Sequence, residues 1–401
     1  MKKPRILINI HYLEIGGAET SLIGLLQALD PKRVDVDLFL NDHRGEMMAY
    51  IPKWVNVLPE IAAYTMIERP IKNVVRHGYL HIAAARLWAK VRLWVYMRRK
   101  HPVDGSAIFG YVGKCVTPML PSLNHLGEYD LAISFVTPHN IVLDKVQAKK
   151  KICWIHTDYS NIDVDTALEL PIWGGYDRIV SISKSVTQNF CQAFPSLQDK
   201  IIEIENILSP GLIRQQVGTE AQLIEMSTVD NGYTLLTIGR YSYQKKLEEI
   251  PIVCRMLTEK GLLVKWYIIG YGGSDEYIRK AIADEGMSEH VILLGKRANP
   301  YPYIKACDWY IQPSRYEGKS VVVREAQILG KPVIITDYPT SASQVQNSVD
   351  GIIVPMDVEK CADAMAMALT DERLKERIVD YLATHDYGNE AEVEKIYSLV
   401  G

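Results

Sequence analysis

The stretch Ser314–Pro332 reads SRYEGKSVVVREAQILGKP, and the rest of the chain is interpreted outward from it. The apolar run Trp309–Ile311 before it predicts a buried strand, and a helix carrying Glu325 follows and ends at the Gly-Lys-Pro sequence. Glu317 precedes that helix, with seven residues between the two carboxylates. Carboxylates accept hydrogen bonds from sugar hydroxyls, and the free N–H groups of a helix start near Ser320 attract a phosphate. A nucleotide sugar combines both chemistries, although Glu and Ser are also common helix caps.

The bulk composition is that of a soluble globular protein. A length of 401 residues is enough for two domains, and 48% apolar with 23% charged residues fits packed cores. Residues 1–200 carry a net charge of +5 and the remainder −8, which indicates an anionic partner for the N-terminal half. Six cysteines without short paired spacing indicate neither a zinc site nor a disulfide framework, and they fit a reducing cytosol. No apolar run is long enough to cross a bilayer, and the first apolar stretch is interrupted as a strand would be, unlike a secretion signal.

Strand and helix patterns alternate through both halves of the chain. Short apolar runs bounded by turn signals predict buried parallel strands. They include Arg5–Ile10, Val34–Leu40, Tyr129–Phe135, Lys151–Ile155, Tyr233–Ile238, Val264–Ile269 and Val333–Thr336. The segment Asn206–Gly211 holds Pro and Gly and is the expected hinge. We therefore expect two α/β domains with parallel sheets, residues 1–207 and 208–385.

The segment Arg69–His101 has the most one-sided charge, with nine Lys and Arg residues and no acidic residue. Apolar side chains alternate with these charges at roughly helical spacing, namely Leu80, Leu87, Trp88, Val91, Trp94 and Val95. A basic helix with Trp on its apolar side suits an anionic membrane surface. The alternative is an amphipathic helix packed on its own domain with a solvated basic face.

Candidate polar residues follow predicted strands in both halves. Gly16 and Gly17 lie between the first strand and a helix, but the third glycine of a dinucleotide fingerprint is absent, so NAD binding is not expected. His156 and Asp158 follow the strand Lys151–Ile155, at the edge where ligands of doubly wound sheets bind. Asp158 equally suits a helix cap. In the second half, Arg240 and Lys245 follow a strand, and two cations in such a loop can clamp a diphosphate.

These motifs resemble the retaining glycosyltransferases of family 4. The resemblance is carried by the E-x7-E segment with SRYEG and GKPV around it, by GGAE, by S-x-S at Ser183–Ser185 and by G-R-x4-K. It covers nearly the whole chain, is strongest in residues 233–355 and is weakest through 60–125. It implies a GT-B architecture, two doubly wound Rossmann-like domains that face a cleft. Residues 1–207 would bind the acceptor and 208–385 the nucleotide-sugar donor, with 386–401 packing back on the first domain.

The resemblance also implies roles for single residues. Arg240 and Lys245 would hold the donor diphosphate and stabilise the leaving charge, Glu317 would contact the donor sugar, and Glu325 the ribose. His156 would lie beside the transferred sugar, which completes a catalytic set of Arg240, Lys245, Glu317 and His156. Lys246 replaces the usual small residue of the motif, and spacing favours Lys245 as the phosphate contact. The remaining donor contacts would be Gly17, Lys319, Ser320, Val321 and Gly272, and the acceptor contacts Glu19 and Asp158.

The implied reaction is transfer of a hexosyl unit with retained anomeric configuration. The donor would be a nucleotide sugar, with a UDP-sugar favoured over a GDP-sugar, and neither a cofactor nor nucleic acid is expected. No Asp-x-Asp metal motif stands where a divalent ion would be expected to bridge the diphosphate, and Arg240 and Lys245 can replace such an ion, so no metal is expected. The EGKS variant resembles enzymes of bacterial capsule and lipopolysaccharide assembly, which implies an oligosaccharide or lipid-linked surface-glycan acceptor. The expected location is cytoplasmic, on the inner face of the cytoplasmic membrane through residues 69–101. The alternatives are a nucleotide-sugar epimerase on the same fold and a non-catalytic glycan-binding protein.

Overall fold

The structure is a computed structural model and divides the chain into two compact units. It describes residues 3–102, 105–157, 159, 162–218, 225–227 and 229–400. Unit 1 consists of Met1–Ile207 and Glu390–Gly401, and unit 2 of Leu208–Asn389. The division after Ile207 lies inside the expected hinge segment. The return to unit 1 starts at Glu390 rather than at residue 386, because the Tyr387 hydroxyl donates to Asp350 of unit 2 at 3.0 Å.

Unit 1 is built on a seven-stranded sheet with the order β3-β2-β1-β4-β5-β6-β7. Its strands are β1 Arg5–Ile10, β2 Asp35–Leu40, β3 Asn56–Val57, β4 Tyr129–Ser134, β5 Ala148–Ile155, β6 Arg178–Ser181 and β7 Ile201–Glu203. All neighbouring pairs are parallel. The order runs outward in both directions from β1 and β4, which is the doubly wound topology that places ligands at the carboxyl ends of the central strands.

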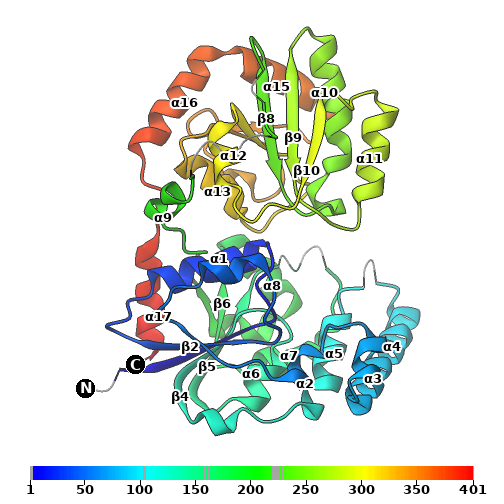
Figure 1. The fold of residues 1–401 in the computed structure, drawn as a ribbon, viewed down its shortest axis with the longest axis vertical. Coiled ribbons are helices and arrows are strands. Elements are labelled where there is room, and N and C mark those ends of the chain that lie inside the picture. Colours follow the sequence, from blue (N-terminus) through cyan, green and yellow to red (C-terminus); the bar gives the residue numbers. More distant parts are fainter. Residues whose placement is uncertain are drawn as a thin grey trace. The chain divides into compact units, whose positions relative to one another are not determined.

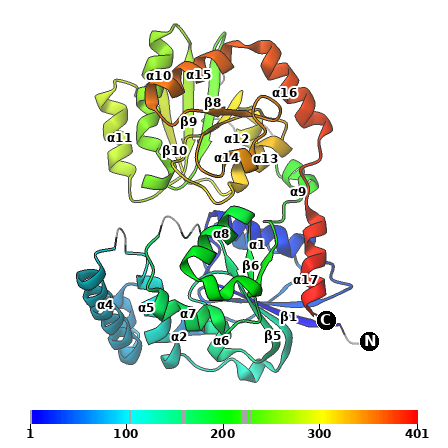
Figure 2. The same ribbon diagram turned by 180° about the vertical axis from the view of Figure 1, so that it is seen from behind.

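Helices lie on both faces of this sheet (Figures 1 and 2). They are α1 Gly17–Ala28, α2 Ala62–Thr65, α3 Ile71–Arg76, α4 Leu80–Lys100, α5 Ile108–Val116, α6 Asn140–Lys145, α7 Thr166–Gly174, α8 Lys184–Ala193 and α17 Val393–Val400. Short 3-10 helices span Glu46–Tyr50, Thr117–Met119, Asn124–Leu126, Pro195–Lys200 and Glu390–Glu392. Figure 1 places α3 and α4 at an outer edge of unit 1, and Figure 2 shows α4 there from the other side. None of the helices among the described residues is both long and apolar enough to cross a membrane.

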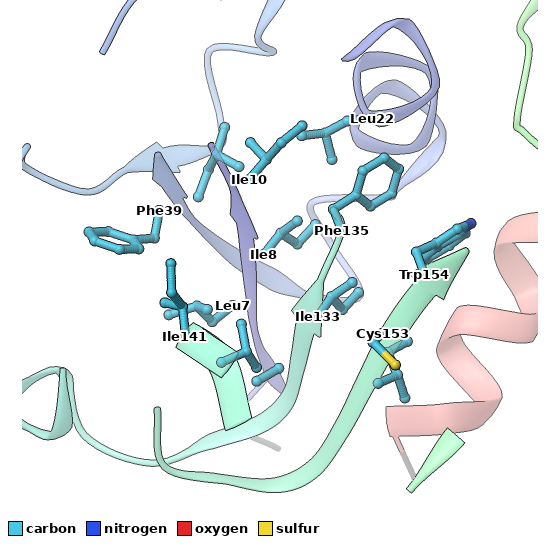
Figure 3. Close-up of a cluster of buried hydrophobic side chains, with 14 of the residues drawn as sticks. Leu7, Ile8, Ile10, Leu22, Phe39, Ile133, Phe135, Ile141, Cys153 and Trp154 are labelled. Atoms are coloured by element: carbon cyan, nitrogen blue, oxygen red, sulfur yellow. The ribbon is translucent and has the colours of Figure 1, made fainter. Parts of the chain in front are cut away.

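The core of unit 1 shows why continuous apolar runs predicted its strands. Ile8 of β1, Ile133 of β4 and Cys153 of β5 are fully buried among side chains from both faces (Figure 3). A parallel sheet covered on both faces needs apolar residues at successive positions, rather than at alternate ones. The C-terminal helix α17 completes this core through Ile396, and the Tyr397 hydroxyl accepts from the backbone N–H of Asp30 at 2.6 Å.

Unit 2 has a six-stranded parallel sheet with the order β10-β9-β8-β11-β12-β13. Its strands are β8 Tyr233–Ile238, β9 Val264–Ile269, β10 Val291–Gly295, β11 Trp309–Gln312, β12 Val333–Thr336 and β13 Ile352–Val354. Its helices are α9 Pro210–Gln215, α10 Ile250–Glu259, α11 Asp275–Asp284, α12 Tyr301–Ala306, α13 Val321–Ile328, α14 Ser341–Gln344, α15 Val358–Thr370 and α16 Glu372–Thr384, with 3-10 helices η7 Tyr243–Lys245 and η8 Leu247–Glu249. The direction of winding changes between β8 and β11, so the loops that follow these two strands lie side by side.

Candidate active site

The loops after β8 and β11 bring Lys245 and Glu317 together. The Lys245 ammonium lies 2.6 Å from Oε1 of Glu317, and the two side chains are only 16% and 8% exposed. Lys245 extends across Gly239, where an added Cβ would lie 3.1 Å from the lysine Cδ. The pair is therefore held in a largely dry position, where charge interactions are stronger than in water.

Four side chains donate hydrogen bonds to the Glu317 carboxylate. Lys245 at 2.6 Å, Ser314 at 2.6 Å and Gln312 at 3.0 Å all donate to Oε1, and Gln244 donates to Oε2 at 3.3 Å. The carboxylate is thereby fixed in one orientation, as a preorganised site requires. Sequence reasoning missed Gln312, Ser314 and Gln244. The signal for Gln312 is its position, because it is the polar end of an otherwise apolar strand.

Arg315 joins the two loops to each other. Its backbone N–H donates to the Gln244 carbonyl at 2.8 Å, and its guanidinium donates to the Tyr243 carbonyl at 2.6 Å and lies 4.1 Å from the centre of that ring. An ion pair of 2.7 Å to Glu248 holds the other side of the guanidinium. The turn that carries Lys245 and the loop that carries Glu317 are thus fastened together by contacts outside the pair itself.

The two neighbouring lysines have different partners. Lys246 donates to the Met356 carbonyl at 2.5 Å and pairs with Glu249 at 2.7 Å, so it is part of the packing of unit 2. Its φ of +56° lies in the left-handed region, which explains why a small residue suits this position. Lys245 is therefore the lysine that contacts Glu317. Arg240 is exposed, and among the described residues no side-chain partner holds its guanidinium.

Glu325 has a different setting from Glu317. It lies inside α13, is 2% exposed, and accepts a hydrogen bond from the Tyr301 hydroxyl at 2.8 Å. Burial raises the pKa of Glu325 to about 7, because removal from water disfavours the charged form, and the Tyr301 hydrogen bond partly opposes this shift. The two carboxylates of the E-x7-E segment are therefore distinct: Glu317 accepts from four side chains including a lysine, whereas Glu325 is fully buried and accepts from the Tyr301 hydroxyl.

The start of α13 is positioned by Gln344 of α14. The Ser320 backbone N–H donates to Oε1 of Gln344 at 3.0 Å, and the Tyr338 hydroxyl donates to the same oxygen at 3.1 Å. The Ser320 side chain makes no capping hydrogen bond to the helix. Lys319 and Val321 flank this position, so the expected donor contacts 319–321 lie at the start of α13. Of the backbone N–H groups there, that of Ser320 is already bound to Gln344.

Gly272 lies in the loop after β9, next to the loop that carries Arg240. Its φ is +153°, and a Cβ added there would be 2.4 Å from the Tyr241 carbonyl oxygen. The Tyr241 backbone N–H also donates to the Tyr271 carbonyl at 2.8 Å. The loops after β8 and β9 therefore pack backbone against backbone at the same edge of the sheet, which only glycine permits at this point.

In unit 1, Glu19 faces its own loop. Glu19 is 5% exposed, and its Oε1 lies 3.4 Å from Nε2 of His11, a residue that sequence reasoning did not single out. A Cβ on Gly16 would lie 2.3 Å from the Glu19 carboxylate, so the first glycine of the GG pair makes room for this side chain. Gly17 is exposed, with open space where a side chain would stand. Glu19, which the resemblance assigns to the acceptor, is thus positioned beside His11.

His156 follows β5 and lies among aromatic rings. Its ring centre is 4.6 Å from that of Phe135, and its Nε2 has no hydrogen-bond partner among the described residues. Burial lowers the pKa of His156 to about 3, so the imidazole is neutral at physiological pH. His139, another missed residue, donates to or accepts from Ser134 at 2.8 Å, and burial lowers its pKa to about 3 as well. Asp158 lies outside the described residues.

The described part of the chain contains no group of three or more His, Cys, Asp or Glu residues arranged to hold a metal ion. Positive charge at the carboxyl edge of unit 2 includes Lys245 and the exposed Arg240. A lysine ammonium and an arginine guanidinium are suited to a diphosphate, one as a point charge and the other as a planar fork.

Comparison with known sequences finds a family model that matches part of the second half of the chain. Residues 222–384 match the family described as Glycosyl transferases group 1. An uncharacterised glycosyltransferase of Methanocaldococcus jannaschii is 24% identical over 209 residues, 51% of this chain and 53% of that protein. The N,N'-diacetylbacillosaminyl-diphospho-undecaprenol alpha-1,3-N-acetylgalactosaminyltransferase of Campylobacter jejuni is 27% identical over 148 residues, 37% of this chain and 38% of that protein. The chain thus spans about half or less of the length of these curated relatives.

Comparison with solved structures concerns the whole chain. The crystal structure of Anabaena HepE in complex with UDP and glucose is similar with a TM-score of 0.67 at 15% sequence identity, and 98% of each chain is covered. At this identity the likeness shows the fold. Together with the two sheet orders it confirms the predicted GT-B fold of two doubly wound parallel-sheet units.

Proposed function

We propose that this chain, which carries a glycosyl transferases group 1 domain on a GT-B fold, is a retaining glycosyltransferase of the hexosyltransferase type. It would move a sugar from a nucleotide sugar, a UDP-sugar in the first place, to a hydroxyl of a surface-glycan acceptor. The observation that carries the proposal is the Lys245–Glu317 pair at 2.6 Å, fixed on two adjoining loops at the carboxyl edge of unit 2.

The proposed chemistry is electrostatic. When the bond between the sugar and the diphosphate breaks, negative charge develops on the diphosphate, and Lys245 with Arg240 stabilises it. Preorganised charges of this kind typically contribute the largest share of such a rate enhancement. Glu317 is the contact to the sugar hydroxyls, and Glu325 the contact to the ribose. Because two cations supply the positive charge, we propose that turnover does not need a metal and is unchanged by a chelator.

The acceptor is proposed to be linked to a lipid. The Campylobacter relative is named for a diphospho-undecaprenol substrate, and the basic segment 69–101 of unit 1 is free of acidic residues. A lipid-linked acceptor lies at a membrane, and a basic segment favours an anionic surface by about 1 kcal/mol for each Lys or Arg near it. We propose that the enzyme works at the inner face of the cytoplasmic membrane.

The test is a transfer assay. UDP- and GDP-sugars are supplied one at a time together with lipid extracts as acceptors, and products are identified by mass spectrometry and by NMR of the new linkage. The proposal expects one donor class to yield a glycolipid with the anomeric configuration of the donor, with and without chelator. An inverted linkage contradicts retention. Conversion of a nucleotide sugar without any acceptor would identify an epimerase instead.

A further inference from the structure

Helix α4 presents large apolar side chains to solvent. Leu80, Leu87, Trp88, Val91 and Trp94 are between 48% and 62% exposed. They recur at intervals of seven, eight, eleven and fourteen residues from the first, which places them on one face of a helix. Surface residues of this kind are normal when scattered, whereas a continuous apolar face marks an interaction site. We call this set the apolar face of α4.

The opposite face anchors α4 to unit 1. Ile82, two residues after Leu80 and therefore about 200° around the helix, is buried in the main core of unit 1, and Ala89 is buried in a smaller cluster with α5. Arg86 lies on the same side and donates to the carbonyl oxygens of Met66, at 2.9 Å, and of Arg69. Because the helix is held along this side, the apolar face has no place in the core of its own unit.

Basic side chains lie around the apolar face of α4, so the solvent-exposed side of this helix is both apolar and basic. Arg69 is paired with Asp42 at 3.3 Å, and Arg86 is used in the anchoring contacts. Arg98 lies over the ring of Trp94 at 4.2 Å, at the end of the helix. The exposed basic residues are Lys72, Arg76, Lys90, Arg98, Arg99 and Lys100. The helix packs on its own unit through Ile82 and Ala89, as the alternative weighed from the sequence expects, but its outward side carries apolar as well as basic side chains.

We propose that α4 inserts its apolar face into the boundary between headgroups and acyl chains of an anionic membrane, with Trp88 and Trp94 as the anchors. This inference rests on the proposed function for the lipid-linked acceptor. It deepens that function, because the membrane contact becomes insertion of the apolar face of α4 and not adhesion by charge alone. Tryptophan prefers this boundary since its ring is apolar and its N–H is polar. The surrounding Lys and Arg side chains reach the anionic headgroups while their stems lie along the apolar layer.

A second copy of this chain is a less fitting occupant. Two copies that met through the apolar face would place the same basic residues opposite one another, and like charges across an interface oppose association. Residues 69–101 contain no acidic side chain that would offset this repulsion. An anionic bilayer meets both requirements at once, because it offers an apolar layer below a negatively charged surface.

The experiment is flotation of the full chain with vesicles of equimolar phosphatidylglycerol and phosphatidylcholine, at low and at high salt. We expect binding that high salt reduces without abolishing. Trp88→Ser with Trp94→Ser should lower the bound fraction at least tenfold at both salt concentrations, because insertion does not depend on charge screening. Arg98→Gln with Arg99→Gln should lower it at low salt alone. Tyr277→Ser, on an equally exposed aromatic residue of unit 2, is the matched control and should bind as the wild type does.

A conservative double variant distinguishes insertion of the apolar face from adhesion by charge. Trp88→Phe with Trp94→Phe should retain binding but remove the quenching of tryptophan fluorescence by vesicles with brominated acyl chains. Unchanged binding of the serine variant, binding abolished by salt, or no binding by the wild type would overturn the proposal. So would self-association of the wild type that the serine variant lacks, since a second copy would then be the occupant. Stabilisation of the serine variant by UDP, measured in parallel, distinguishes these outcomes from failure of the proposed donor site.

Discussion

The two units share one architecture but differ at the carboxyl edges of their sheets. In unit 2 this edge holds charge: Lys245 and Glu317 form an ion pair among further hydrogen-bond donors, and Arg240 is exposed beside them. In unit 1 the same edge holds the imidazoles of His139 and His156, both kept neutral by burial. The fold alone therefore does not determine what a doubly wound unit does. Under the proposed function, the Lys245–Glu317 edge of unit 2 would supply the charge stabilisation.

The two units also differ in how pH affects their stability. The raised pKa of Glu325 means that folded unit 2 holds a proton that the unfolded chain releases between pH 4.5 and about 7, so stability is lost as pH rises through this range. The lowered pKa values of His139 and His156 act in the opposite direction. In the unfolded chain these two imidazoles are protonated below pH 6.5, whereas in the folded unit they stay neutral down to about pH 3. Stability is therefore lost as pH falls through this range.

The largest effect is expected from removing the ammonium group of Lys245 at the carboxyl edge of unit 2. Lys245→Ala should lower kcat by roughly 10²–10³-fold, the usual cost of removing one preorganised group that stabilises developing charge. Lys246→Ala is the matched control, because it removes the neighbouring ammonium, which pairs with Glu249 instead. It should reduce thermal stability and leave kcat within a few-fold of wild type. Equal losses of kcat in the two variants would contradict the assignment of Lys245.

The pH dependence of unit 2 is tested with Glu325→Gln in the ligand-free protein. Glutamine keeps an oxygen for the Tyr301 hydroxyl but carries no charge. Relative to wild type, the free energy of unfolding of this variant should increase between pH 4.5 and about 7, by about 3 kcal/mol as an upper estimate. Denaturant unfolding at a series of pH values measures the difference. A difference that does not change with pH would show that Glu325 is ionised in the folded chain.

The opposite slope of unit 1 is tested with His139→Asn, whose amide takes the place of Nδ1 beside Ser134. This variant loses packing at every pH, so the informative quantity is how its free energy of unfolding changes with pH. Between pH 6.5 and pH 5 the wild type should lose about 2 kcal/mol more stability than the variant, since one buried imidazole no longer contributes. Parallel slopes for the two proteins would mean that His139 takes up its proton without unfolding.

The smallest expected effect concerns the first loop of unit 1. Glu19→Gln removes the carboxylate charge that lies 3.4 Å from Nε2 of His11, while keeping the shape of the side chain. We expect kcat/KM for the acceptor to fall about tenfold, the size expected when one polar contact to the acceptor is lost, with KM for the donor unchanged. Glu14→Gln, on the same loop and 3.7 Å from Arg44, is the control and should have little effect. A change confined to the donor KM would move Glu19 to the donor site.

The fold was predictable because its signals are local. Strands such as β1 and β8 are continuous apolar runs, and the E-x7-E helix is bounded by Ser320 and by Gly330, whose φ of +71° is the expected helix ending. The resemblance added the GT-B fold, which the comparisons confirm. Those signals lie within a few residues of each other, so no tertiary contact is needed to recognise them.

The details of the site were not predictable, because they depend on contacts across the fold. Gln312 and Gln244 reach Glu317 from two different loops, and Gln344 reaches Ser320 from α14. The preference for Lys245 over Lys246 was available from spacing, whereas their different partners, Glu317 and Glu249, are seen only in the structure. For α4 the sequence left two readings open, an apolar side facing a membrane or one packed on its own domain, because both sides of this helix are apolar and periodicity does not tell which side is buried.

The central claim is that unit 2 binds a nucleotide sugar through the E-x7-E segment, and thermal-shift measurements with UDP-, GDP-, ADP- and dTDP-sugars test it most directly. Wild type and Glu325→Ala are compared. A ligand at ~100 times its dissociation constant stabilises by about 2.7 kcal/mol, which is easily detected. We predict that sugars of one nucleotide, UDP in the first place, stabilise the wild type and not the variant. No shift of the wild type with any of them, or equal shifts of both proteins, would contradict the account.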